Sequence, residues 1–98
     1  MTIIKRIEIN NIEKSLNDVI EASYKLMMFQ EQMKFVNSQL ENNRRFFNSG
    51  LISKETYEGN QRNFKIEIDD LKRNINSTIT DTTKIVNDVE TLIKINKI

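Results

Sequence analysis

Hydrophobic residues recur at every seventh position through the first half of the chain. This column contains Ile12, Val19, Leu26, Met33, Leu40 and Phe47. Further apolar residues widen the stripe: Ile9, Leu16, Ile20 and Met27 in its first half, and Ala22, Phe29 and Val36 in its second. A seven-residue repeat sustained over this length predicts a long α-helix that pairs with another helix, as in a coiled coil.

Capping signals give the expected ends of this first helix. Asn10, with Glu13 three residues later, has the spacing of an N-terminal capping box. Gly50 lies just beyond the last apolar residue, and glycine readily adopts the left-handed conformation that ends many helices. We therefore predict a first helix over about residues 11–48.

A short connector separates the first helix from a second one. Ser53 is a favoured N-cap residue, and Glu55 places a negative charge in the first turn, where the helix dipole stabilises it. Ile52 and Tyr57 flank this cap with the spacing of a hydrophobic staple. Because short connectors join antiparallel neighbours, we expect residues 49–53 to form a tight turn between two antiparallel helices.

Heptad spacing continues through the second half of the chain. One column contains Tyr57, Phe64, Leu71, Thr78, Ile85 and Leu92, and the other contains Ile68, Ile75, Thr82 and Val89. The second helix should run over about residues 54–96 and pack along the first. The predicted fold is all-α, a long coiled-coil-like antiparallel hairpin that forms one domain over residues 1–98 and completes a helical bundle by self- or hetero-association.

A threonine-rich segment leaves the continuity of the second helix open. Thr78 and Thr82 both fall in the predicted seam, and threonine is a poor helix former. If the helix is continuous, these residues form a small polar layer opposite Ser23 and Tyr24. The alternative is a break in the helix near residues 77–81.

Composition removes most kinds of active site. The chain has no histidine and no cysteine, so it lacks the usual ligands of zinc, haem and iron–sulfur clusters and the commonest proton carrier near neutral pH. Two glycines, Gly50 and Gly59, are too few for a glycine-rich phosphate loop. Asp69 and Asp70 are neighbours, and neighbours on a helix point about 100° apart. We expect no catalytic residue, no metal, no cofactor and no small-molecule substrate.

The charged residues indicate a solvated surface. The net charge is +1, and the 15 lysines and arginines are spread along the chain among 14 carboxylates. This pattern does not favour a nucleic-acid partner. No apolar run approaches the roughly 18–20 residues that cross a bilayer, and Glu8 interrupts the first segment, unlike a signal peptide. We expect a cytoplasmic protein, at most peripheral to a membrane through an indirect or weak association.

A second apolar stripe lies roughly opposite the heptad column of the first helix. It consists of Tyr24, Met28 and Phe35, with Phe46 further along. A single hairpin buries one seam only, so these large side chains remain in water unless another helix covers them. The isoleucine-rich ends add to this surface. The expected partner-binding residues are Tyr24, Met28, Phe35, Phe46, Ile4, Ile95 and Ile98.

The sequence is compatible with three kinds of partner for this surface. A second copy of the chain would give a four-helix bundle, whereas the helices of another protein would complete a mixed bundle. A membrane surface is a third covering, for the isoleucine-rich ends only. The chemistry of the chain therefore predicts a non-enzymatic module that works by association with a partner.

The sequence around the turn has a recognisable pattern. Gly50-Leu51-Ile52 is followed by the polar Ser53 and then by Tyr57. Hydrophobic positions match in spacing before the glycine, and further positions match after it: Phe29, Met33, Val36, Leu40 and Phe47, then Arg62, Phe64 and Leu71. Over about residues 29–75 this pattern resembles the steadiness box, the helical-hairpin core segment of the ESCRT-I subunit that in eukaryotes also carries a ubiquitin-binding domain. The family's basic, glutamine-containing segment is replaced by residues 63–66.

The resemblance implies a rigid piece of a membrane-sorting or membrane-remodelling assembly that packs beside the helical hairpins of other subunits. The same turn is similar to the short SHOCT-type hairpin, which implies oligomerisation. The length and the central turn also resemble the WXG-type substrates of type VII secretion, which pair into four-helix bundles. Here Phe47-Asn48-Ser49-Gly50 stands in place of the tryptophan motif. A substrate or partner of a type VII secretion system is therefore the alternative function.

Overall fold

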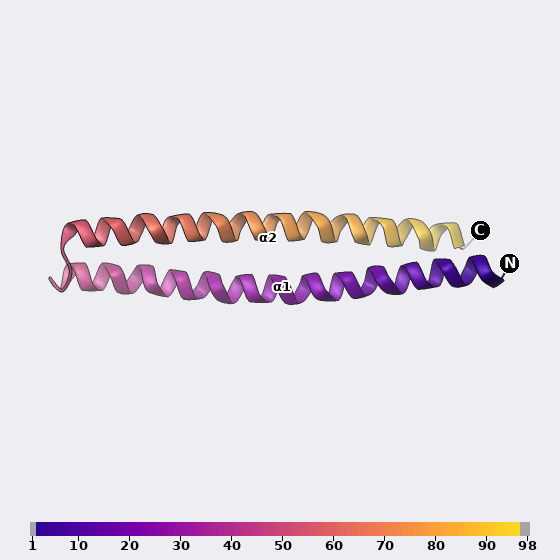
Figure 1. Ribbon diagram of the computed structural model, residues 1–98, viewed down its shortest axis with the longest axis horizontal. Helices are drawn as coiled ribbons and strands as arrows, with labels where there is room; N and C mark the ends of the chain where they lie inside the picture. The colour runs from indigo at the N-terminus through magenta and orange to yellow at the C-terminus, as the bar shows by residue number, and fades with distance from the viewer. Residues whose placement is uncertain (1, 97–98) are drawn as a thin grey trace. The chain divides into compact units, whose positions relative to one another are not determined.

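The computed structural model describes residues 2–96 and, of their side chains, those of residues 10–95. It contains two helices, α1 (Thr2–Asn48) and α2 (Lys54–Asn96), and no strand within the described residues. Figure 1 shows the two helices and the turn that joins them. The predicted all-α helical hairpin is thereby confirmed.

The start of the first helix was predicted too late in the chain. α1 begins at Thr2, about nine residues before the expected position. No proline or glycine lies in the first ten residues, so nothing there ends or prevents a helix. The capping-box spacing of Asn10 and Glu13 therefore falls inside α1, where backbone groups already have helical partners.

The turn ends α1 with a Schellman motif. Gly50 has a φ of 77°, in the left-handed region. Its N–H donates to the carbonyl oxygen of Phe47 at 3.1 Å, and the N–H of Leu51 donates to that of Phe46 at 2.9 Å. These two hydrogen bonds satisfy carbonyl groups that the end of a helix leaves without partners. The predicted end of the first helix at residue 48 is confirmed.

Ser53 caps the beginning of α2, as the sequence predicts. Its Oγ accepts a hydrogen bond from the backbone N–H of Thr56 at 3.1 Å, and its carbonyl oxygen accepts one from the N–H of Tyr57 at 2.9 Å. The first bond satisfies one of the four free N–H groups at a helix start. α2 accordingly begins at Lys54.

The hairpin is organised as two compact units, each built from a segment of α1 and a segment of α2. The turn unit comprises Met27–Ile75, and the terminal unit comprises Met1–Leu26 with Asn76–Ile98. In the turn unit, Val36 and Leu71 are buried in the seam between the helices. The remaining seam positions alternate at spacings of three and four residues and are buried or half-buried: Phe29, Met33, Leu40, Asn43 and Phe47 of α1, and Tyr57, Gln61, Phe64, Ile68 and Ile75 of α2.

The terminal unit has a narrower apolar seam. Val89 is its buried hydrophobic residue within the described part. The half-buried seam positions are Ile12, Ser15, Val19, Ala22 and Leu26 of α1, and Thr78, Thr82, Ile85 and Leu92 of α2. Three residues predicted to widen the seam are instead exposed, namely Leu16, Ile20 and Met27. The alternating spacing places Ser15 and Ala22 in the seam, which turns these larger neighbours outward; the side chain of Ile9 lies outside the described residues.

The helix α2 continues through the threonine-rich segment, so the alternative of a break near residues 77–81 is wrong. The Oγ1 of Thr82 donates a hydrogen bond to the carbonyl oxygen of Thr78 at 2.7 Å, which satisfies the hydroxyl inside its own helix. Both threonines line a groove of the terminal unit beside Ala22. Ser23 and Tyr24, which were expected opposite them, are exposed.

Candidate interaction surfaces

The predicted partner-binding residues with described side chains are all exposed. The exposed fractions are 67% for Tyr24, 51% for Met28, 65% for Phe35, 47% for Phe46 and 56% for Ile95. The side chains of Ile4 and Ile98 lie outside the described residues. Tyr24 and Ile95 belong to the terminal unit, and the other three belong to the turn unit.

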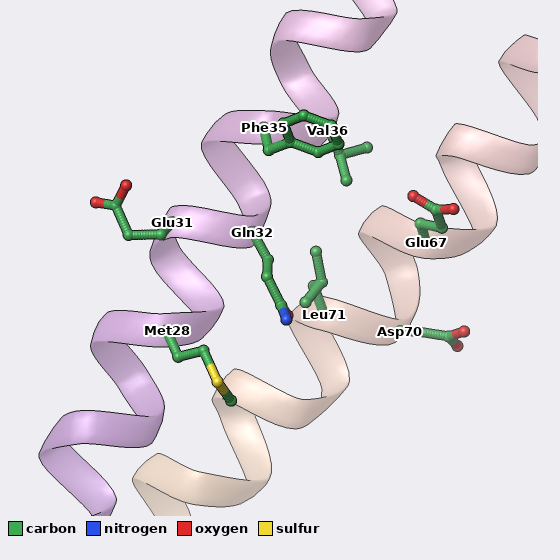
Figure 2. A pocket seen from close by; sticks show the side chains of 8 residues that line it. All are labelled: Met28, Glu31, Gln32, Phe35, Val36, Glu67, Asp70 and Leu71. Atoms are coloured by element: carbon green, nitrogen blue, oxygen red, sulfur yellow. The ribbon is translucent and has the colours of Figure 1, made fainter.

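Met28 and Phe35 line a common groove in the turn unit. Its volume is about 560 Å³. Figure 2 shows Met28 and Gln32 extending from α1 toward α2, with Val36 and Leu71 between the helices. The buried seam therefore forms the floor of the groove, and exposed apolar atoms of α1 form one wall.

Phe46 lines a second, smaller groove of the same unit, with a volume of about 90 Å³. Its other lining residues are Gln39, Asn42, Asn43, Asn60 and Phe64. Residues 28, 32, 35, 39, 42 and 46 are spaced alternately by four and three, so they follow one side of α1. We call the surface formed by the residues of both grooves the groove side of the turn unit.

Charge distinguishes the groove side from the rest of the turn unit. Its charged lining residues are Glu31, Glu67 and Asp70, and no lysine or arginine lines either groove. Glu31 pairs with Lys34 at 3.3 Å, and Asp70 pairs with Arg73, and both ion pairs are exposed. Because Glu67 also borders the groove, its three carboxylates outnumber these two cations, and the rim of the larger groove is weakly acidic.

The opposite side of the same helix segments carries charges of both signs. By the same heptad spacing, it contains Arg44, Arg62, Lys65 and Lys72 together with Glu41, Glu58 and Asp69, all of them exposed. Such a mixture is typical of a helix surface that stays in water. The two sides of the turn unit thus differ in kind, and only the groove side combines aromatic, methionine and amide side chains with an acidic rim.

A buried polar cluster lies under the smaller groove, and the sequence analysis missed it. Asn43 is 4% exposed. Its Nδ2 donates to the carbonyl oxygen of Tyr57 at 3.2 Å and to the Oε1 of Gln61 at 3.4 Å, and its Oδ1 accepts from the Nδ2 of Asn60 at 3.0 Å. The seven-residue series through Ala22, Phe29 and Val36 reaches position 43, and extending it would have placed this asparagine in the seam.

Aromatic packing joins this cluster to the turn. The rings of Phe47 and Tyr57 stack with their centroids 4.5 Å apart and their planes at 17°. The hydroxyl group of Tyr57 accepts a hydrogen bond from the Nε2 of Gln61 at 3.0 Å. The polar atoms of the cluster are thus satisfied, and no buried side-chain polar atom among the described residues lacks a partner.

The terminal unit presents its own apolar residues. Ile79, Val86 and Ile93 recur every seventh residue along one side of α2 and are exposed. Ile79 and Val86 line a groove with Leu26, Thr82 and Thr83. A second groove of this unit is bordered by Asp18, Glu21, Lys25 and Asp81. With volumes of about 290 and 240 Å³, these two grooves are smaller than the larger groove of the turn unit.

Within the residues that the structure describes, no group of three or more acidic side chains is arranged to hold a metal ion. None of the described helix segments is apolar over a length that could cross a membrane. No protein-family model, curated protein or solved structure matches the chain.

Proposed function

We propose that this chain is a non-enzymatic protein-interaction module whose groove side is buried when a partner helix packs along it. One observation carries the proposal: Met28, Phe35 and Phe46 follow one side of α1 and are about half exposed or more. Monomeric proteins rarely leave several large apolar side chains aligned in water, and such patches mark interaction sites. Among the described residues, only Val36, Leu71 and Val89 are buried hydrophobic residues.

The size of these side chains supports association. Complete burial of one fully exposed phenylalanine or methionine contributes about 1.5–3 kcal/mol. Because Met28, Phe35 and Phe46 are 51%, 65% and 47% exposed, burying the exposed part of all three contributes about 2–5 kcal/mol, which offsets part of the roughly 4–15 kcal/mol of motional freedom lost on association. The rigid turn and the capped helix ends hold these residues in place before the partner arrives, so little further ordering is required.

The resemblance of residues 29–75 to the steadiness box suggests a setting for such a module. In that setting the chain acts as an ESCRT-I-like core subunit, an oligomeric scaffold in membrane sorting or remodelling. The partner is then a helical hairpin of another subunit, and the chain works in the cytoplasm, peripheral to a membrane. Neither a nucleic acid nor a small molecule takes part.

Photo-crosslinking tests the proposal. A photo-reactive phenylalanine derivative replaces Phe35, and in a matched control it replaces Asn37, which is exposed on the opposite side of the same helix. In cells that express the chain, position 35 should form a covalent product with another polypeptide, and position 37 should not. Adding Met28→Glu should abolish the product. The proposal is wrong if position 35 yields no polypeptide product, or if both positions yield the same products equally.

A further inference from the structure

We propose that the partner of the groove side is a basic amphipathic helix of a different protein. This inference rests on the proposed function and adds the chemistry of the partner. Two features distinguish the groove side, namely its line of apolar side chains and the carboxylates on its rim.

The spacing of the apolar residues fits a helix. Met28, Phe35 and Phe46 are separated by seven and eleven residues along α1. At 1.5 Å per residue they span about 27 Å, which is the length of a helix of about 18 residues. A helix that lies in a groove presents apolar residues at matching intervals of three, four and seven positions. The floor formed by Val36 and Leu71 lies within reach of such residues.

The rim defines the charge of the partner. Glu31 borders the groove from α1, and Glu67 and Asp70 border it from α2. In Figure 2, Glu31 and Asp70 lie at the outer edges of the two helices, so carboxylates flank the apolar floor on both sides. A partner helix with lysine or arginine beside its apolar face therefore places cations next to these carboxylates. Such complementarity accelerates association and selects among partners.

The same charges disfavour the two other partners, a second copy of the chain and an anionic membrane. Two copies joined through the groove side would bring six carboxylates into one interface, and Glu67 of each copy would enter it without the lysine or arginine partner that Glu31 and Asp70 have in their own chain. Like charges brought together across an interface destabilise it. An anionic membrane surface would be repelled by the same rim. A basic helix from another protein is the occupant that satisfies both the apolar floor and the rim.

Two adjacent methionines provide a direct test. Met28 lines the groove, whereas Met27 is exposed and does not line it. The full chain is labelled with ¹³C at its methionine methyl groups and titrated with an amphipathic 22-residue helical peptide that has leucine on one face and lysine or arginine on both flanks. The control peptide has glutamate at each basic position. We expect the basic peptide to shift the Met28 signal and leave that of Met27 unchanged, and to bind at least tenfold more tightly than the acidic peptide.

Charge reversal in the protein sharpens the test. Glu67→Lys with Asp70→Lys should weaken binding of the basic peptide about tenfold and strengthen binding of the acidic one. The matched control, Glu41→Lys with Asp69→Lys, changes the same number of charges on the opposite side and should leave both affinities within twofold. Circular dichroism of each variant establishes that the helices are retained.

Three outcomes overturn the inference. The first is that neither peptide shifts Met28, the second that both peptides bind equally, and the third that anionic vesicles shift Met28 more than the basic peptide does. A crosslink from position 35 to a second copy of the chain also overturns it but leaves the proposed function standing. The absence of any polypeptide crosslink refutes the proposed function itself.

Discussion

A single buried asparagine distinguishes the seam of the turn unit from a uniformly apolar one. Asn43 uses both hydrogens of its amide group, toward Tyr57 and Gln61, and its oxygen accepts from Asn60. These bonds can form in only one alignment of α1 against α2, because a shift by one helical turn would leave the amide buried without partners. Buried asparagine fixes register in coiled coils by the same mechanism. We infer that Asn43 has this role in the hairpin.

Replacing this residue should therefore be costly. Asn43→Ala removes three hydrogen bonds, leaves the Nδ2 of the half-buried Asn60 without its acceptor, and opens a cavity. We expect the free energy of unfolding to fall by about 1–3 kcal/mol, measured by urea denaturation. Asn37→Ala, at an exposed position of the same helix, should change it by less than about 0.5 kcal/mol. Equal effects of the two substitutions would contradict the assignment.

At the scale of the helices, the same substitution should have opposite effects at the two glycines. Gly50 has a φ of 77°, and a Cβ there would meet nothing within 4 Å, so Gly50→Ala introduces backbone strain alone. Gly59 lies inside α2, and its added Cβ would meet only the flexible end of Arg62 at 3.9 Å. We expect Gly50→Ala to lower the free energy of unfolding by about 1–2 kcal/mol, and Gly59→Ala to raise it by about 0.5–1 kcal/mol.

Thermal unfolding followed by circular dichroism measures both changes. Gly50 ends α1, and the left-handed conformation is unfavourable for an L-residue with a side chain. At position 59 alanine reduces the backbone freedom of the unfolded chain and suits the helix. If both variants melt at a higher temperature, the turn does not require glycine at position 50. If both melt at a lower temperature, α2 requires glycine at position 59.

Helix ends set by local chemistry could be predicted from the sequence, and others could not. Gly50 and Ser53 act through hydrogen bonds to residues within five positions, so their roles are visible in the sequence. The start of α1 was misplaced because the spacing of Asn10 and Glu13 also occurs inside helices. In the threonine-rich part of α2, hydroxyl groups bond to carbonyl groups of their own helix, so they are satisfied without interrupting it, and composition alone does not reveal this.

For the molecule as a whole, the candidate site could be predicted only on one of its helices. Met28 and Phe35 were found because heptad arithmetic separates them from the seam of α1. Glu67 and Asp70 were missed, because identifying the residues of α2 that border the groove requires the pairing of the two helices. Because the pairing of the helices is not visible in the sequence, periodicity also placed Leu16 in the seam, although it is 49% exposed. Periodicity identifies a stripe, whereas alignment against a second helix determines which edge of the stripe is buried.

Because the seam and the groove side use different residues, substitutions on the groove side should abolish assembly without unfolding the chain. Met28→Glu with Phe35→Glu places two carboxylates at positions that are 51% and 65% exposed. Exposed substitutions usually change stability by less than about 0.5 kcal/mol each. The isolated chain should therefore keep its helical content and unfold at nearly the same urea concentration. Its assembled form should be lost, because each glutamate would have to be buried against the apolar face of the partner helix, which costs free energy.

Sedimentation velocity checks the loss of assembly, at concentrations where the unaltered chain is assembled with its partner. A matched variant, Met27→Glu with Ile66→Glu, changes two apolar residues of similar exposure that do not line the grooves and should remain assembled. Val36→Glu should instead unfold the turn unit of the isolated chain, because Val36 is 5% exposed and the substitution buries a charge in the seam. An unchanged sedimentation coefficient for the Met28 and Phe35 double variant would show that the partner packs elsewhere on the chain.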